Sequence, residues 1–590
     1  MMARLLLLAL CALALVPLVA RGEHCHAAPQ PNATQNLYPI DTSTLRLQRQ
    51  YVNGTIKGKA YFAGDPSTAG GGGANFWVLH LWGATPYELG YAHGRMMRQE
   101  AKSMLTQVWQ YIENQVASAI PKMPKWVQDL VEKIGLPAAL DLTAAWTKPY
   151  TGAYFHEEAQ GLADGAGVDV KTVWRIHMIG ELTKGSCSMV GAWGAALAPS
   201  LKAGGTKTLQ VRALDWDMDG PFRDFPAVIV YHINESDDNS DAKSGGGGGG
   251  RDGSNAAFAR AAAAAAATGE VVAVAEPNGG HSFANVGFVG WIGALTGMSS
   301  DGVGISEIGV SFPDDTFGKE SRKGTPFTFL LRDILQFDAD LQAAVTRVST
   351  ANRTCNLILG AGDGGLGKGT DGGGRAGAAG GFRGFQVNHA TCNVFDDTDM
   401  APTNRSWHPL IENVVYYGMD WVCPNFDVVL ARQLNKHHGA LTPAALINDV
   451  LPIVQTGDLH AAVYDLTRLQ LFVAFAKPVT PLGGLGAAGG TVGHDVVADC
   501  AYSRQFTRLD LVAAFAEPAP TGGAEDTVGA NSFTCAMCKK LLPYVGKHEC
   551  ASKCESWWHW AQGICNSMCN ELTKWAPTAA CWEAGYCPKP

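Results

Sequence analysis

The chain has 590 residues and a formal net charge of −9, because 54 Asp and Glu residues outnumber 45 Lys and Arg residues. This acidic balance argues against a nucleic-acid-binding protein, whose affinity depends on a basic face. Apolar residues make up 46% and charged residues 17% of the chain, so most of it can bury a core. Many of the 70 glycines occur in runs such as 245–250 and 360–381, which we interpret as surface-loop insertions.

The N-terminus has the pattern of a secretory signal peptide over residues 1–22, with Arg4 before an apolar run that ends in small residues. A membrane anchor would need about 20 uninterrupted apolar residues, and this shorter run contains Pro17. We therefore expect a secreted or lysosomal protein. Five Asn-x-Ser/Thr sequons agree with export and mark expected surface positions: Asn32, Asn53, Asn234, Asn352 and Asn404.

Apolar periodicity predicts helices over about 86–182, within an N-terminal segment 23–186. From residue 187 the pattern changes to strands, in SMVGAWGAAL, TLQVRALDWD, AVIVYHI, VVAVAEP, FANVGFVGWIGALTGM and GVGISEIGVSF. Two helices are expected around 327–335 and 338–348, the second capped by Asp338. Strands return in NLILG and GFQVNHATCNV, a helix covers about 426–434, and AAVYDLTRLQLFVAFA is hairpin-like. This order favours a layered α+β domain over 187–516 with antiparallel sheets.

The sharpest local motif is GSCSMVGAWG at 185–194, which is followed by RALDWD at 212–217. It places Cys187 at the head of a strand, with Arg212 and Asp215 three residues apart on the next strand. Residues three apart lie on opposite faces of an ideal strand, so both can reach one site only if the strand twists, bulges or ends between them. The alternative is an inert buried thiol or half of a disulfide, which is the usual role of a lone cysteine in a strand.

This motif resembles the cysteine branch of the N-terminal nucleophile (Ntn) hydrolases. LWGATPYELGYAHG, GWIGALTGMSSDGVGISEIG and QVNHATCN are similar to successive segments of the acyl-coenzyme A:6-aminopenicillanic acid acyltransferase family, to which acid ceramidase is related. The resemblance covers about 81–516 and implies an αββα Ntn-hydrolase sandwich. It also implies autocatalytic cleavage between Ser186 and Cys187, which leaves two fragments as an α–β heterodimer. No metal or other cofactor is expected.

The resemblance assigns roles that suit the residue types. The freed α-amine of Cys187 would be the general base for its own thiol. Asp215 would hold that amine, and Arg212 would lower the thiol pKa and orient the acyl group. Asn388 would donate to the developing oxyanion, unless it is an ordinary turn residue. Arg405 resembles a second Arg of the ceramidase relatives, or is a plain surface residue within the Asn404 sequon.

Two other sets of polar residues bear on the expected site. Where relatives have a second polar oxyanion group, this chain has Gly309 or Val310, which leaves Glu307 or a backbone N–H as candidates. Glu88 and His93 are five residues apart, so they do not stack on one helix face as metal ligands do, and we expect helix-start and packing roles for them.

Eight of the 15 cysteines lie between Cys535 and Cys587, which predicts a disulfide-rich module over 533–590 after a Pro/Gly-rich linker at 517–532. The spacing resembles a saposin domain, a small helical fold. That resemblance implies the pairs Cys535–Cys587, Cys538–Cys581 and Cys554–Cys565, to which a further pair Cys550–Cys569 adds a second rung. Eight cysteines allow 105 pairings, and the sequence alone selects none.

Aromatic residues are concentrated in this module, with Trp557, Trp558 and Trp560 in one run. They would compensate for a small core, or contact lipid, since Trp favours membrane interfaces. Together these patterns and resemblances predict a secreted or lysosomal amidohydrolase that acts on N-acyl amides, most of all on lipid amides such as ceramides. Its expected partners are the lipid-amide substrate and a membrane surface, and no nucleic acid. The alternatives are an acyltransferase or a phospholipase B-like ester hydrolase on the same fold, or a non-catalytic lipid-binding protein.

Overall fold

The computed structural model describes residues 33–42, 45–64, 73–119, 125–182, 186–216, 218, 220–233, 280–309, 320–366, 380–401, 408–418, 424–478 and 499–521. The expected signal peptide and the Cys-rich module, with its four expected disulfides and the run of Trp557, Trp558 and Trp560, lie outside these residues. Arg405 and the sequons at Asn32, Asn234 and Asn404 also lie outside them. The other two sequon residues, Asn53 and Asn352, are exposed.

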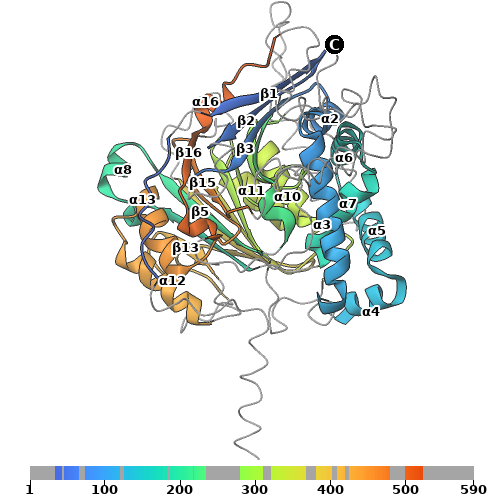
Figure 1. Ribbon diagram of the computed structural model, residues 1–590. Coiled ribbons are helices and arrows are strands. Elements are labelled where there is room, and N and C mark those ends of the chain that lie inside the picture. The colour runs from blue at the N-terminus through green and yellow to red at the C-terminus, as the bar shows by residue number, and fades with distance from the viewer. Residues whose placement is uncertain are drawn as a thin grey trace, which may run out of the picture.

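Two β-sheets form the centre of the protein (Figure 1). The larger has ten strands in the order β1 (Arg46–Asn53), β2 (Ile56–Ala63), β3 (Phe76–Trp82), β6 (Pro226–His232), β7 (Phe283–Phe288), β8 (Gly297–Ser299), β9 (Val303–Ile308), β10 (Leu357–Asp363), β11 (Gly381–Val387) and β12 (Cys392–Phe395). The smaller has six, in the order β13 (Val414–Tyr417), β4 (Ser186–Trp193), β5 (Thr208–Asp215), β14 (His460–Asp465), β15 (Gln470–Phe475) and β16 (Thr507–Asp510). Neighbouring strands are antiparallel except for the parallel pair β3 and β6.

Helices cover the outer faces of both sheets, which gives four layers in the order α, β, β, α. Against the ten-stranded sheet pack α2 (Pro86–Met96), α10 (Phe327–Phe337) and α11 (Leu341–Thr350). Further helices pack on these and on one another: α3 (Arg98–Ala119), α4 (Lys125–Ile134), α5 (Leu136–Thr147), α6 (Ala153–Ala166) and α7 (Val170–Leu182). On the six-stranded sheet lie α12 (Pro424–Lys436), α13 (Pro443–Ala445) and α14 (Leu451–Val454). The short α8 (Pro199–Ala203) joins β4 to β5, and α16 (Leu511–Phe515) follows β16.

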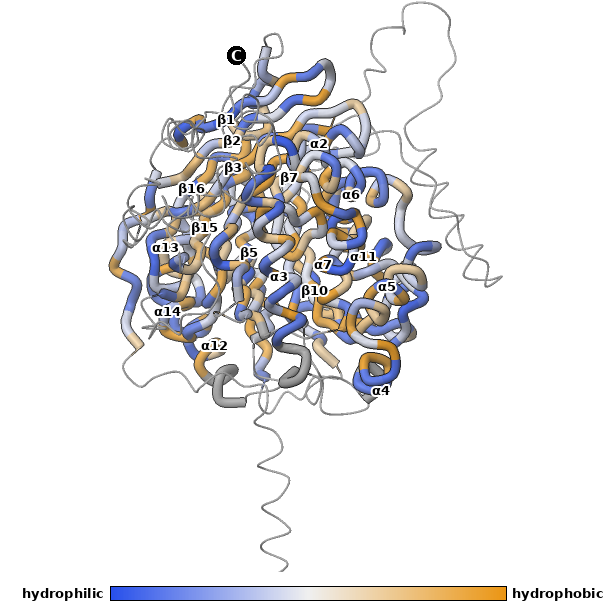
Figure 2. Tube along the Cα trace, turned by 45° about the vertical axis from the view of Figure 1, so that its right-hand side comes forward, coloured by the Kyte–Doolittle hydropathy of each residue, from blue (hydrophilic) through white to orange (hydrophobic). Residues whose placement is uncertain are grey.

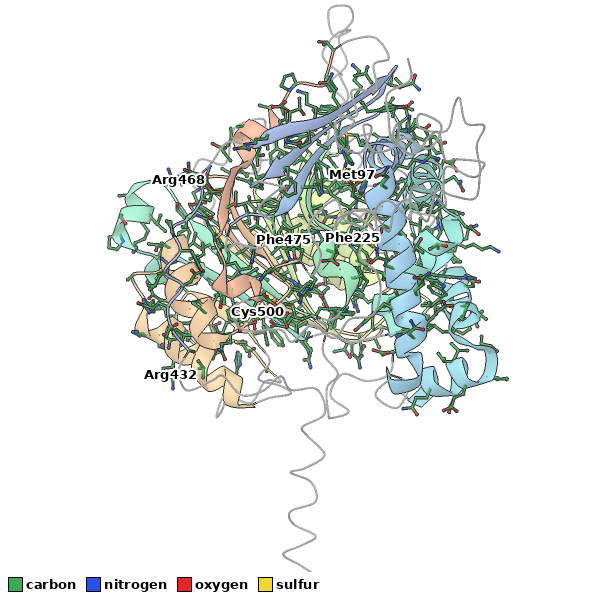
Figure 3. All side chains as sticks on the ribbon, in the orientation of Figure 1. Met97, Phe225, Arg432, Arg468, Phe475 and Cys500 are labelled. Carbon is green, nitrogen blue, oxygen red and sulfur yellow. The ribbon has the colours of Figure 1, made fainter. Side chains whose placement is uncertain are left out.

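Alternation along the strands explains the layers. On β5, Val211 and Ala213 pack among the residues under α12 and α14, whereas the amide of Gln210 points the other way and donates to Ser306 on β9, at 2.7 Å. Every residue of β5 and β6 is buried, as expected for strands covered on both faces. Apolar residues accordingly follow the central strands in Figure 2. In Figure 3, Phe225 and Phe475 lie inside, whereas Arg432 and Arg468 lie at the outside.

Most expected elements are present, including the helices over 86–182, the strands β4 to β7, the strands β9 to β11 and the hairpin of β14 and β15. The expected cap of α11 was wrong. Asp340, not Asp338, accepts from the backbone N–H of Ala343 at 2.8 Å, and both oxygens of Asp338 instead bind the guanidinium of Arg347. The sequence also gave no indication of strands β1 to β3, which attach the N-terminal segment to the ten-stranded sheet.

Glu88 and His93 have the helix-start and packing roles that were expected. Glu88 accepts from the backbone N–H of Ala84 at the start of α2, where Thr85 is the N-cap. His93 is fully buried and its Nε2 accepts from the backbone N–H of Gly290 at 2.9 Å. Burial lowers the pKa of His93 to about 3. A neutral ring is therefore part of the core here.

Helices α2 and α6 pack backbone against backbone because each carries two glycines four residues apart. A Cβ on Gly90 would lie 2.0 Å from the carbonyl oxygen of Glu158, and one on Gly161 would lie 2.0 Å from that of Tyr87. Gly94 and Gly165 make equivalent contacts one turn further on.

Within the described part of the chain, no helix is both long enough and apolar enough to cross a membrane.

We predict that Gly161→Ala lowers the free energy of unfolding by about 3 kcal/mol, because the added methyl must push two helix backbones apart. Gly73→Ala is the matched control, since the nearest atom to a Cβ there is 3.7 Å away. Urea unfolding followed by circular dichroism measures both. Equal stability of the two variants would contradict the close helix contact.

Candidate active site

Cys187 lies at the start of β4 with its side chain between the two sheets. It is 1% exposed, and its Sγ lies 3.3 Å from the guanidinium of Arg212 on the neighbouring strand β5. Burial raises the pKa of the Cys187 thiol to about 12, an effect that Arg212 opposes and that the carboxylates of Glu307 and Asp215 reinforce. The thiol is therefore protonated in the uncut chain at neutral pH.

Arg212 is fully buried and connects the two sheets. The same terminal nitrogen that contacts Cys187 also lies 3.1 Å from a carboxylate oxygen of Glu307 on β9. Its Nε and other terminal nitrogen have no hydrogen-bond partner among the described residues. Unpaired buried donors are uncommon in folded proteins, and here they belong to the group that contacts the thiol.

Asp215 is the last residue of β5, and the pairing of β5 with β4 continues without a bulge up to it, so Arg212 and Asp215 keep the opposite faces that an ideal strand gives them. Arg212 faces the ten-stranded sheet, whereas Asp215 lies in register opposite Ser186 on β4, at the bond that precedes Cys187. Its carboxylate accepts from the backbone N–H groups of Gly457, at 2.6 Å, and Asp458, at 3.0 Å. The cysteine is thus approached by a cation on one side and a carboxylate on the other.

Asn388 follows β11, at the same end of the ten-stranded sheet as Glu307. The register places Leu357 opposite Val387, and the next residue, Ile358, opposite Ile308. Asn388 Oδ1 accepts from the backbone N–H groups of residues 390 and 391, which is the turn role considered as the alternative. Its Nδ2 is buried and has no partner among the described residues, so a donor is still present. The structure describes no hydrogen bond between Asn388 and Cys187.

An apolar pocket opens onto Cys187. It has a volume of about 60 Å³, and its lining includes Ile176, Ile179, Phe222, Trp291 and Phe327, together with Cys187, Leu214 and Glu307. The sequence did not indicate these wall residues, which come from helices and loops on both sides of Cys187 in the chain. Gly309, one of the two candidate positions of the missing polar group, also lines the pocket, and the other, Val310, lies outside the described residues. Glu307 is therefore the charged residue that the structure brings to this place.

Two further points concern the cysteines and the possible metal ligands among the described residues. Cys187, Cys355, Cys392 and Cys500 are all thiols. Within the described ranges, no group of three or more His, Cys, Asp or Glu side chains could hold a metal ion.

Two proteins of Dictyostelium discoideum are similar to this chain over most of its length. Protein dcd1A is 32% identical over 490 residues, which cover 81% of this chain and 92% of that protein. The chain belongs to the dcd1 family. Protein dcd1B is 29% identical over 491 residues, covering 82% of this chain and 81% of dcd1B. No family model matches the sequence.

Two solved structures give weaker matches to this dcd1 family member. One is an N-acylethanolamine-hydrolyzing acid amidase ortholog of Caenorhabditis elegans, with a TM-score of 0.28, 12% identity, and coverage of 48% of this chain and 93% of that one. The other is a penicillin V acylase of Agrobacterium tumefaciens, with a TM-score of 0.28, 13% identity, and coverage of 49% and 83%. At these TM-scores and identities, the two structures do not determine the fold or activity of this chain.

We predict that the charges around Cys187 set its reactivity in opposite directions. Glu307→Gln removes a negative charge that raises the thiol pKa, so iodoacetamide should alkylate Cys187 about tenfold faster at pH 8, whereas Arg212→Gln should slow it by a similar factor. Mass spectrometry of the Cys187 peptide measures the rate. Glu412→Gln, at an exposed position, is the control for net charge. A rate that is the same in all three variants would show that neither charge acts on the thiol.

Proposed function

We propose that this protein is an N-terminal-cysteine amidohydrolase, activated by cleavage between Ser186 and Cys187, that hydrolyses N-acyl amides. The observation that carries the proposal is the placement of two charges around one cysteine. Arg212 contacts the thiol at 3.3 Å, and Asp215 lies in register opposite the residue whose bond to Cys187 would be cut. A buried thiol with a structural role alone needs neither charge.

Self-cleavage would begin with attack of the Cys187 thiol on the carbonyl carbon of Ser186. The peptide C–N bond breaks, the acyl group moves to sulfur, and the nitrogen of Cys187 becomes a free α-amine. Water then opens the thioester, which leaves a carboxylate on Ser186 and restores the thiol. The thiol proton passes to that nitrogen as the C–N bond breaks. The α-amine that serves as the base in turnover therefore exists only after cleavage.

Catalysis by the cleaved enzyme would use the same groups on a substrate amide. The α-amine, whose ordinary pKa is about 8, accepts the thiol proton as sulfur attacks the carbonyl carbon, and then gives it to the leaving amine. Water hydrolyses the resulting acyl-thioester and releases the acid. The unpaired N–H groups of Arg212 and the Nδ2 of Asn388 would stabilise the carbonyl oxygen as it gains charge. Asp215 would hold the amine by a charge-assisted hydrogen bond.

A lipid amide is the substrate class that the pocket supports best. The pocket is lined by aliphatic and aromatic side chains. Burial of an apolar acyl chain against them contributes about 25 cal/mol of favourable free energy per Å² of apolar surface removed from water. The volume of about 60 Å³ in the uncut chain holds only the beginning of an acyl chain, so a long chain would require the pocket to widen after cleavage. The carboxylate of Glu307 at its base disfavours an acyl group that carries negative charge near the carbonyl.

The two fragments would remain together as one enzyme. Strand β3, before the cleavage point, pairs with β6, after it, over Trp77 to Trp82. Ile176 and Ile179 of α7 line the pocket with residues from the other fragment. We place this enzyme in the secretory pathway or the lysosome, on the strength of the signal-peptide pattern and the exposed sequon residues Asn53 and Asn352. Its Cys-rich C-terminal module would present lipid substrate from a membrane surface.

We predict that the mature protein consists of two fragments separated between Ser186 and Cys187. Denaturing gels and N-terminal sequencing of the larger fragment test this directly, and Cys187→Ala should remain a single chain because it has no thiol. Cys392→Ala is the control, because it also removes a thiol of the catalytic domain. A fully active wild-type enzyme that is never cleaved would contradict the proposed mechanism.

We predict that the C-terminal module acts on access to lipid and leaves the chemical step unchanged. Replacing Trp557, Trp558 and Trp560 by Ala should lower the turnover of a long-chain lipid amide in vesicles by about tenfold or more, since each buried Trp contributes on the order of 1 to 3 kcal/mol. Turnover of a short, water-soluble acyl amide should be unchanged. Equal loss on both substrates would instead make the module a stability element of the catalytic domain.

A further inference from the structure

A short turn at residues 455–458 surrounds the carboxylate of Asp215. It joins α14 to β14, and two of its residues have left-handed backbone, Gln455 with φ of 57° and Gly457 with φ of 91°. A Cβ at Gly457 would also lie 2.9 Å from the Cβ of Ala461. Few residues other than glycine adopt such a φ without strain. The backbone of this turn therefore favours glycine at position 457.

The turn presents three donors to one carboxylate. The backbone N–H groups of Gly457 and Asp458 bind Oδ1 of Asp215, and the hydroxyl of Thr456 binds Oδ2 at 2.7 Å. Asp215 is 3% exposed and Thr456 is 1% exposed. Water therefore makes little contribution to orienting this carboxylate, and the turn does so instead.

Thr456 also reaches the strand that carries the nucleophile. Its Oγ1 lies 2.7 Å from Oγ of Ser188, the residue after Cys187, and Ser188 is 2% exposed. One hydroxyl thus connects the strand of the cysteine with the carboxylate at the end of β5. Asp215 and Ser188 lie 241 and 268 residues before Thr456 in the sequence, so no local pattern predicts these two hydrogen bonds.

The turn is itself fixed from the outside. The carbonyl oxygen of Gly457 accepts from the backbone N–H of Tyr502, at 3.1 Å, and that of Asp458 accepts from Ala501, at 2.8 Å. A side-chain oxygen of Asp458 accepts from the N–H of Trp216, the residue after Asp215, at 3.0 Å. The donors around Asp215 are therefore held in place from two further segments of the chain.

We propose that Thr456 is a positioning residue of the active site, which fixes the carboxylate of Asp215 relative to Cys187 both for self-cleavage and for turnover. This inference rests on the proposed function, because it assigns Thr456 a role through the Asp215 that would hold the α-amine. A hydroxyl that served the fold alone would affect stability and leave both rates unchanged.

The test compares Thr456→Val, which removes the hydroxyl, with Thr456→Ser, which keeps it. Thr143→Val is the matched control, because Thr143 is also fully buried and its hydroxyl binds only the carbonyl oxygen of Ala139 in α5, at 2.8 Å. The readouts are the half-time of chain cleavage on denaturing gels, and kcat and KM for the decanoyl amide of 7-amino-4-methylcoumarin. Thermal unfolding reports the stability of each variant.

We expect Thr456→Val to slow cleavage and to lower kcat by about 10- to 100-fold, because a misplaced Asp215 carboxylate holds the α-amine away from its productive position, with KM unchanged. Thr456→Ser should stay within about threefold of wild type, and Thr143→Val should match wild type in both rates. Wild-type rates in Thr456→Val, or equal losses in Thr143→Val, would overturn the role of Thr456 while the proposed function stands. A wild-type chain that is never cleaved would instead overturn the proposed function itself.

Discussion

The regular pairing of β5 with β4 up to Asp215 is the constraint on which the candidate site depends. Residues three apart on a strand lie on opposite faces of the sheet, so Arg212 and Asp215 approach Cys187 from its two sides. Arg212 lies between the sheets beside the thiol, and the carboxylate of Asp215 lies in register opposite Ser186. One strand therefore supplies charges of opposite sign to the two functional atoms of a single cysteine.

The sandwich makes this arrangement possible because it excludes water from the charged groups. Arg212 is fully buried and Glu307 nearly so, and removing one partner of such a pair typically costs 3 to 5 kcal/mol. The ion pair joins β5 to β9 across the two sheets, so the same contact that sets the environment of Cys187 also fixes the spacing of the layers. Burial gives the thiol a high pKa in the uncut chain, which is consistent with a nucleophile that turns over substrate only once an amine is generated beside it.

The sequence predicted those parts of the fold that depend on local pattern, such as strands β4 and β5 with their apolar residues. Cys187, Arg212 and Asp215 were selected by the resemblance of their motifs to a known family, and the structure brings them together. Strand β1 was missed because its edge position leaves it half exposed, without a clear alternation. The parallel pairing of β3 with β6 and the turn at Thr456 depend on contacts between segments far apart in the chain. Asp338 was assigned as a cap in place of Asp340 because both residues precede the helix and only packing distinguishes them.

The most direct test of the account is to identify the atom that carries the acyl group during turnover. The cleaved enzyme would be mixed with a decanoyl amide, quenched in acid within milliseconds to seconds, digested and analysed by mass spectrometry. The account predicts a decanoyl adduct on the peptide that begins with Cys187, labile to hydroxylamine as a thioester is. An adduct on another residue, or rapid hydrolysis of the amide with Cys187 never acylated, would contradict the assignment of Cys187 as the nucleophile.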